Sequence, residues 1–143
     1  MKLIDILLVE DNEGDILLTT EALQEGKIAN RISVVKDGME ALEFLEKKGA
    51  YKEAITPDLI LLDINLPKMN GHEVLKSIKA IDHLRHLPVI ILSTSSSQED
   101  VMKSYKNYAN CYITKPVDAS DFLKIVSSIE DFWITVVQLP KKD

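Results

Sequence analysis

Short apolar runs alternate with amphipathic stretches along the chain. The runs are rich in Leu, Ile and Val, and they cover residues 3–9, 32–35, 59–62, 89–92 and, more weakly, 111–113. Runs that are apolar on both faces are typical of central strands in a parallel sheet, because helices cover both sides of such a sheet. The pattern therefore predicts five buried strands.

The stretches between these runs have helical periodicity. Met39, Leu42 and Leu45, for example, recur three positions apart and would lie on one side of a helix. Helices are expected near residues 14–25, 39–48, 72–81, 98–108 and from 119 onward. Strands and helices that alternate in this order predict one doubly wound α/β domain with a parallel sheet and right-handed crossovers.

Composition narrows the class of protein. The 143 residues are 45% hydrophobic and 28% charged, which suits one globular domain. No apolar run reaches the roughly 20 residues of a membrane helix, and the N-terminus has no signal-peptide cleavage pattern. The single cysteine, Cys111, excludes an internal disulfide, and the net charge of −6 argues against binding to nucleic acid or an anionic membrane. We therefore expect a soluble cytoplasmic protein.

Polar side chains that could carry chemistry follow the predicted strands. In open α/β sheets, ligands bind beyond the carboxyl ends of the strands. The residues at these positions are Glu10, Asp11, Asp63, Asn65, Ser93, Thr94 and Lys115. Three carboxylates on one edge repel one another unless a cation neutralises them, and such hard oxygen ligands suit Mg²⁺.

Each of these residues also has a purely structural explanation. Acids at strand ends are often solvated, a run of serines can be a polar loop that caps a helix, and a lysine before proline is usually at the surface. Their joint occurrence at four strand ends on one predicted edge favours the functional interpretation.

Four segments together resemble the receiver domain of two-component response regulators. They are VEDNEGD, DLILLDINLPKMNG, PVIILSTS and YITKP, and the resemblance covers about residues 3–130. It implies a flavodoxin-like fold with strand order 2-1-3-4-5 and a receiver domain at residues 1–130. It also implies a phosphoacceptor signalling domain, not an enzyme, that assists its own phosphotransfer and autodephosphorylation.

The resemblance assigns a metal site. Asp63 resembles the phosphoacceptor and a Mg²⁺ ligand, and Asp11 resembles the carboxylate that binds Mg²⁺ directly. Glu10 would reach the metal through water, and the backbone carbonyl of Asn65 would complete the protein ligands.

The resemblance also assigns phosphoryl-binding and switch residues. Ser93 is similar to the hydroxyl residue that binds a phosphoryl oxygen, and Lys115 to the lysine that pairs with the phosphoryl group. Tyr112 matches the aromatic residue that changes rotamer together with the Ser93 loop, and Thr94 would lie where a hydrolytic water enters.

A sensor histidine kinase is the implied partner. Thr94 replaces the usual Ala or Gly, and Tyr108 replaces the glycine that usually ends the fourth helix. Together with LSTS, NCYITK and the Phe132-Trp133 pair, these departures resemble single-domain regulators that partner cyanobacterial-type phytochrome kinases. A phytochrome is therefore the candidate kinase.

Two other functions are left open by the residues. A Mg²⁺-dependent phosphohydrolase of the haloacid dehalogenase type needs a second carboxylate two positions after its nucleophile, where this chain has Asn65. A degenerate receiver that acts only as a binding module would form no acyl phosphate. Turnover of small phosphomonoesters would identify the hydrolase.

Residues 131–143 form a C-terminal extension of the predicted domain. We expect it to continue the last helix and to contribute to a homodimer interface, because its apolar residues would leave a wet patch on a monomer. These residues are Phe132, Trp133, Val136, Val137 and Leu139. The alternative is that the extension folds back onto its own domain.

Overall fold

Five parallel strands form one sheet in the order β2-β1-β3-β4-β5. A computed structural model describes residues 3–25, 30–115, 118–129, 132 and 140 of the chain. The strands are β1 (Ile4–Val9), β2 (Asn30–Val35), β3 (Leu59–Leu62), β4 (Val89–Ser93) and β5 (Cys111–Thr114). The predicted doubly wound, flavodoxin-like sheet and its strand order are confirmed.

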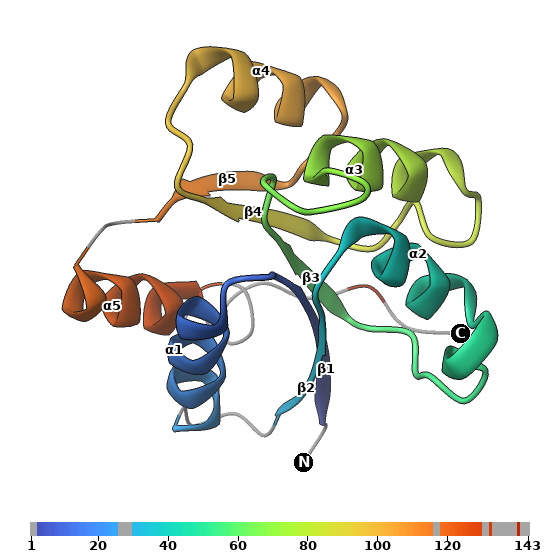
Figure 1. Cartoon of the computed structure of the whole chain (residues 1–143), viewed down its shortest axis with the longest axis horizontal. Coiled ribbons are helices and arrows are strands. Elements are labelled where there is room, and N and C mark those ends of the chain that lie inside the picture. Colours follow the sequence, from blue (N-terminus) through green and yellow to red (C-terminus); the bar gives the residue numbers. More distant parts are fainter. Residues whose placement is uncertain (1–2, 26–29, 116–117, 130–131, 133–139, 141–143) are drawn as a thin grey trace.

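Helices cover both faces of this sheet (Figure 1). They are α1 (Glu13–Gln24), α2 (Gly38–Glu46), α3 (Gly71–Ala80), α4 (Gln98–Lys106) and α5 (Ala119–Ile129), with a short 3-10 helix, η1 (Gly49–Tyr51), after α2. The helices α1 and α5 pack together on one face, and α2, α3 and α4 lie on the other. No helix in the described part of the chain is long and apolar enough to cross a membrane.

The second strand differs from the prediction in its extent. It begins at Asn30, two residues before the apolar run, and pairs with β1 from Ile4↔Asn30 to Val9↔Val35. Periodicity missed these two positions because they are polar. Arg31 lies on the edge strand and pairs with Asp5 of β1 at 2.6 Å, which keeps a charged residue within the sheet.

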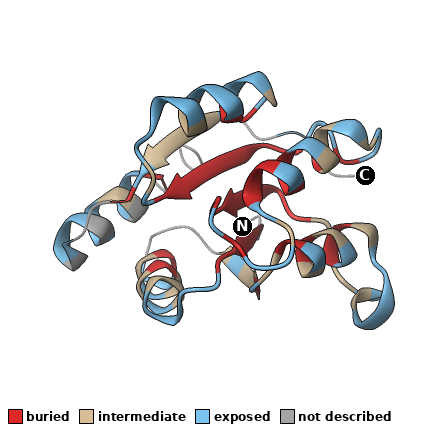
Figure 2. Ribbon diagram, turned by 45° about the horizontal axis from the view of Figure 1, so that its top comes forward, coloured by how far each residue is buried: buried red, intermediate tan, exposed pale blue. Residues whose placement is uncertain are grey.

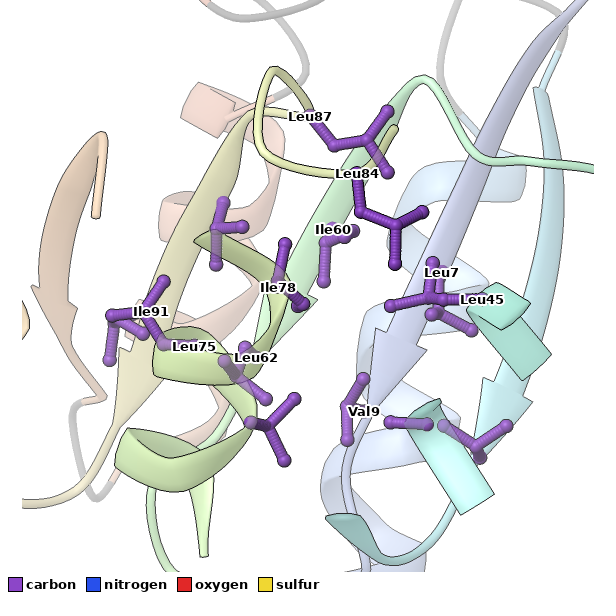
Figure 3. Close-up of a cluster of buried hydrophobic side chains, with 14 of the residues drawn as sticks. Leu7, Val9, Leu45, Ile60, Leu62, Leu75, Ile78, Leu84, Leu87 and Ile91 are labelled. Carbon is purple, nitrogen blue, oxygen red and sulfur yellow. The ribbon is translucent and has the colours of Figure 1, made fainter. Parts of the chain in front are cut away.

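Two apolar clusters, one on each face of the sheet, hold the layers together. Figure 3 shows the first, in which Leu7, Ile60 and Ile91 from the strands meet Leu75 and Ile78 from α3. The second lies under α1 and α5. The interior strands are buried throughout their length, whereas the outer sides of the helices are exposed (Figure 2). Each buried Leu or Ile contributes about 1.5–3 kcal/mol, so the strand ends rest on a rigid base.

Side-chain caps fix where the helices on the functional edge begin. Asn12, Asp37, Asn70 and Ser97 each accept a backbone N–H of the first helical turn. Such caps contribute about 1 kcal/mol each. They determine the length of the loops that carry the candidate site residues.

Glycine allows the loop after β3 to fold back closely. A Cβ atom on Gly71 would lie 2.2 Å from the carbonyl oxygen of Asp63, and one on Gly38 would lie 1.9 Å from that of Met69. No other residue fits at either position without moving the backbone. The start of α3 is thereby packed directly against the backbone of Asp63.

The expected C-terminal extension is described at only two of its positions. Helix α5 ends at Ile129, and Phe132 is 54% exposed. Trp133, Val136, Val137 and Leu139 lie outside the described residues, as does the expected continuation of the last helix.

Candidate functional site

Three carboxylates converge at the carboxyl edge of the sheet. Glu10 and Asp11 follow β1, Asp63 follows β3, and these strands are neighbours. Each residue contributes one oxygen to a group whose members lie within 4.8 Å of one another. Among the described residues this is the only such group of three or more His, Cys, Asp or Glu side chains.

Burial makes this cluster electrostatically costly. Glu10 is 2% exposed and Asp63 is 8% exposed, whereas Asp11 reaches solvent. Burial, together with the negative charge of Asp63, raises the pKa of Glu10 to about 7, although the hydrogen bond from Lys115 opposes this shift. Glu10 therefore favours a proton or a cation beside it, and the all-oxygen donor set fits a hard divalent cation such as Mg²⁺.

Lys115 brings a buried positive charge to the same edge. Its ammonium donates hydrogen bonds to Glu10, to Asp15 at 2.9 Å and to Asp63 at 3.4 Å. Burial alone would lower the pKa of Lys115, but the hydrogen bond to Glu10 and the negative charge of Asp63 outweigh it and raise the pKa. Lys115 is therefore charged at neutral pH.

Backbone groups orient the carboxylate of Asp63. Its Oδ1 accepts the N–H of Ile64 at 2.7 Å and that of Asn65 at 3.4 Å, while Oδ2 is the oxygen nearest Lys115. The backbone N–H of Asp63 donates to the carbonyl of Val9 at 3.1 Å. The two oxygens thus differ in their surroundings, and the side chain of Asn65 is exposed.

The loop between β4 and α4 carries the hydroxyl residues. Ser93 ends β4 and is fully buried, and its carbonyl accepts the N–H of Lys115 at 2.7 Å, so the ends of β4 and β5 lie together. Thr94 is exposed. Ser93 and Lys115 are thus both on the edge that carries the acidic cluster.

Tyr112 connects β5 with this loop. It is half-buried, packs against the first apolar cluster, and donates its hydroxyl to the carbonyl of Ser95 at 2.7 Å. Burial raises the pKa of the Tyr112 phenol. The side chain therefore points toward the loop between β4 and α4.

Sequence reasoning missed two residues of this region. Asp15, in the first turn of α1, contacts Lys115, and it stands four positions after Asp11 within the motif VEDNEGD. His72, at the start of α3, is 8% exposed and lies 2.9 Å from Asp100. The position of Asp15 four residues after Asp11 could have indicated that it lies near the site. No sequence pattern links His72 to Asp100, which is 28 positions away.

Chemically, the edge combines an oxygen-lined cation site, a carboxylate and a fixed ammonium. A cation and an ammonium on either side of a carboxylate would allow an anionic group to approach it. This is the arrangement of a phosphoacceptor domain. The family model of the response regulator receiver domain matches residues 6–127, and the chain belongs to that family, whose members are signalling domains and not metabolic enzymes.

The chain is similar to response regulators of phytochrome systems. The response regulator Rcp1 of Synechocystis is 44% identical over 135 residues, which cover 94% of this chain and 92% of Rcp1. The crystal structure of Mn²⁺-bound Rcp1 has a TM-score of 0.94 at 43% identity and covers 96% of this chain and 99% of that one. Phosphorylated RcpA, a cyanobacterial phytochrome response regulator, has a TM-score of 0.95 at 46% identity, with 98% and 100% covered. The expected resemblance is confirmed.

Proposed function

We propose that Asp63 accepts a phosphoryl group from the phosphohistidine of a sensor histidine kinase. The observation that carries this proposal is the position of the Asp63 carboxylate, within 4.8 Å of two further carboxylates and 3.4 Å from the ammonium of Lys115. A carboxylate oxygen attacks phosphorus, an O–P bond forms, and the N–P bond breaks with its electron pair returning to the imidazole nitrogen. The product is an acyl phosphate on Asp63.

Glu10, Asp11, Asp63 and the backbone carbonyl of Asn65 are the proposed ligands of Mg²⁺. When bound, the cation neutralises charge on the transferring phosphoryl group. The Mn²⁺-bound structure of Rcp1 supports a divalent cation in a closely similar chain. The raised pKa of Glu10 supports it independently, since a cation would offset the cost of burying the charged carboxylate and its repulsion by Asp63.

Lys115 and Ser93 are the proposed phosphoryl-binding side chains. Lys115 is charged, buried and within reach of Asp63. Its ammonium is already desolvated in the folded protein, so pairing with a phosphoryl oxygen would carry no further desolvation cost for it. Ser93 lies on the adjacent strand end and offers a hydroxyl. The phosphorylated structure of RcpA supports phosphorylation of this type of chain.

Ser93 and Tyr112 are the proposed switch. The loop that begins at Ser93 supplies the carbonyl of Ser95 that Tyr112 contacts at 2.7 Å. A loop shift toward a phosphoryl group would therefore change the surroundings of the Tyr112 side chain. Phosphorylation would bias an existing equilibrium between two arrangements of this pair.

A phytochrome histidine kinase is the proposed donor. This rests on the similarity to RcpA and to the bacteriophytochrome response regulator AtBRR, which is 40% identical with a TM-score of 0.75 over 99% of this chain. Phosphotransfer from a panel of purified histidine kinases would test it, with fast transfer expected only from a phytochrome. Preferential labelling by an unrelated kinase would overturn it.

The test of the phosphoacceptor is intact mass after incubation with acetyl phosphate and Mg²⁺. We expect a gain of one phosphoryl group, lost in Asp63→Asn and in the presence of a chelator. Asp82→Asn is the matched control, because the side chain of Asp82 is 92% exposed and takes no part in the site. Labelling of Asp63→Asn to the level of the unmodified protein would reject Asp63 as the acceptor. Turnover of phosphomonoesters would favour the hydrolase instead.

A further inference from the structure

Ser95 uses all three of its polar groups to connect separate parts of the site. Its N–H donates to Oγ of Ser93 at 3.3 Å, its carbonyl accepts the hydroxyl of Tyr112 at 2.7 Å, and its own hydroxyl donates to Oδ2 of Asp100. The position of Ser95 therefore determines which group Ser93 contacts and where Tyr112 finds its acceptor.

Asp100 anchors Ser95 to two helices. It lies in the first turn of α4, where its N–H is capped by Ser97 at 3.1 Å and its carbonyl accepts the hydroxyl of Ser104 at 2.8 Å. Its second carboxylate oxygen, Oδ1, lies 2.9 Å from Nε2 of His72 on α3. Hydrogen bonds from Ser95 and then from His72 lower the pKa of Asp100, so it is ionised at neutral pH.

The ionised carboxylate defines the role of the histidine. An ionised carboxylate only accepts hydrogen bonds, so Nε2 of His72 must carry the proton and donate it to Asp100. The ring of His72 is buried, and its Nδ1 has no hydrogen-bond partner among the residues that the structure describes. The contact with Asp100 is thus the polar contact that fixes this ring.

Helix α3 makes His72 a rigid starting point. Val74, Leu75 and Ile78 of the same helix are fully buried in the core, and Gly71 packs against the backbone of Asp63. A chain of hydrogen bonds consequently runs from a fixed helix through Asp100 and Ser95 to the hydroxyl of Ser93.

We propose that His72 is a positioning residue for phosphoryl binding. Through Asp100 and Ser95 it holds the N–H of Ser95 against Oγ of Ser93. Because that oxygen then accepts a hydrogen bond, the hydroxyl proton of Ser93 is left to donate to a phosphoryl oxygen. This inference rests on the proposed acceptor role of Asp63. It adds helix α3 to the parts of the fold that control the site.

A purely structural role for His72 predicts a different result. If the contact with Asp100 only joined α3 to α4, its loss would lower the stability of the protein and leave phosphoryl binding by the folded protein unchanged. A positioning role predicts weaker phosphoryl binding in a folded protein whose cation site is intact, since His72 contacts none of the three clustered carboxylates.

The experiment measures binding of beryllofluoride, formed from BeCl₂ and NaF, in the presence of Mg²⁺. This anion resembles a phosphoryl group on a carboxylate and gives an equilibrium affinity by calorimetry. The variants are His72→Leu, which keeps bulk without a donor, His72→Gln, whose amide can replace the Nε2 donor, and Ser95→Ala. Ser104→Ala is the matched control, because the hydroxyl of Ser104 donates to the backbone carbonyl of Asp100 and not to its carboxylate.

We expect His72→Leu and Ser95→Ala to bind beryllofluoride about five- to tenfold more weakly, with His72→Gln and Ser104→Ala close to the unmodified protein. The double variant His72→Leu/Ser95→Ala should bind beryllofluoride no more weakly than whichever single variant binds it less tightly, because both substitutions interrupt the same chain of hydrogen bonds. Affinity for Mg²⁺ alone should not change in any variant.

The inference is overturned if folded His72→Leu or Ser95→Ala binds beryllofluoride as tightly as the unmodified protein does. If the unmodified protein binds Mg²⁺ but not beryllofluoride, the proposed acceptor function fails, and the inference fails with it.

Discussion

Thr94 is the exposed residue next to the buried hydroxyl of Ser93. Because Ser93 is proposed to bind the phosphoryl group, we expect the branched side chain of Thr94 to lie where a hydrolytic water would have to enter in line. On this proposal, bulk at this position would hinder the water and would leave the ligands of the cation unchanged. Thr94 is therefore the residue expected to influence the lifetime of the acyl phosphate.

Thr94→Ala should shorten that lifetime. We expect the acyl phosphate to decay at least about threefold faster. A threefold change corresponds to a decrease of less than 1 kcal/mol in the activation free energy. The decay is followed by intact mass after removal of the donor. Thr94→Val, which keeps the branched shape, is the control and should decay at the unmodified rate. Equal or slower decay in Thr94→Ala would reject the steric explanation.

At the scale of single residues, sequence reasoning succeeded where the sheet itself brings side chains together. Glu10, Asp63 and Lys115 each follow a parallel strand, and parallel strands end at one edge, so their meeting could be predicted without coordinates. Asp15 and His72 lie on helices, where the side chains they meet depend on how each helix is rotated against its neighbours. Periodicity does not contain that information.

At the scale of elements, α2 and α4 are each followed within two residues by a residue other than glycine that has a positive φ. Lys47, directly after α2, has φ 58°, and Tyr108, two positions after the end of α4, has φ 68°. After α4, the N–H of Ala109 reaches the carbonyl of Ser104 at 3.0 Å, which closes the helix end. Tyr108 is 75% exposed, so little packing compensates for its strained backbone.

Tyr108→Gly should therefore stabilise the protein. We expect the free energy of unfolding to rise by about 0.5–1 kcal/mol, because glycine adopts positive φ without a steric cost. Urea denaturation monitored by circular dichroism measures this. Tyr108→Ala serves as the control, since alanine removes the ring but keeps the Cβ atom that causes the strain. A gain in both variants would assign the effect to loss of the exposed ring.

The extents of the strands and helices follow the sequence closely, with a physical reason for each departure. The runs 59–62 and 89–92 became β3 and β4 almost unchanged because both are buried on their two faces. The edge strand β2 was underestimated because an edge tolerates polar residues such as Asn30 and Arg31. Tyr108 was recognised as replacing a glycine, but its backbone angle required coordinates.

At the scale of the whole molecule, the acidic cluster links cation binding to folding. The buried carboxylates of Glu10 and Asp63 repel each other in the folded chain and separate when it unfolds. A cation that binds only the folded arrangement stabilises it by mass action, by about 1.4 kcal/mol at ten times its dissociation constant.

The melting temperature should therefore rise with the concentration of Mg²⁺. Asp63→Asn should be more stable than the unmodified protein in a chelator, because one repelling charge is gone, and its melting temperature should depend less on Mg²⁺. Differential scanning calorimetry measures both effects, with the exposed Asp82→Asn variant as the control. If the melting temperature of the unmodified protein does not change with the concentration of Mg²⁺, the assignment of the cation site is contradicted.

We also propose that the chain forms a homodimer through residues 131–143 and the surface beside α5. In the described part of this region, Ile113, Ile125, Ile129 and Phe132 line an apolar groove of about 290 Å³, and Phe132 is 54% exposed. Trp133, Val136, Val137 and Leu139 would add apolar area that a second copy could cover.

Light scattering on the intact chain and on a chain truncated after Glu130 tests the dimer. We expect a dimer for the intact chain at tens of micromolar and a monomer for the truncated one, because truncation removes the apolar patch. Phe132→Ser should weaken association in the full-length chain, whereas Leu17→Ser on the exposed side of α1 should not. Monomers of the intact chain with and without phosphorylation would refute the dimer and favour an extension folded onto its own domain.

The hydrogen bond from Lys115 to Glu10 joins positions 105 residues apart, so the site is complete only when both of these distant parts of the chain are present. A nascent chain that has left the ribosome as far as β4 already has Glu10, Asp11, Asp63 and Ser93, but it still lacks the ammonium. A proteolytic fragment that ends before β5 is in the same state. Under the proposed mechanism, competence for phosphorylation therefore begins only after β5 and Lys115 have been synthesised. Fragments that end before Lys115 would not draw phosphate from the kinase.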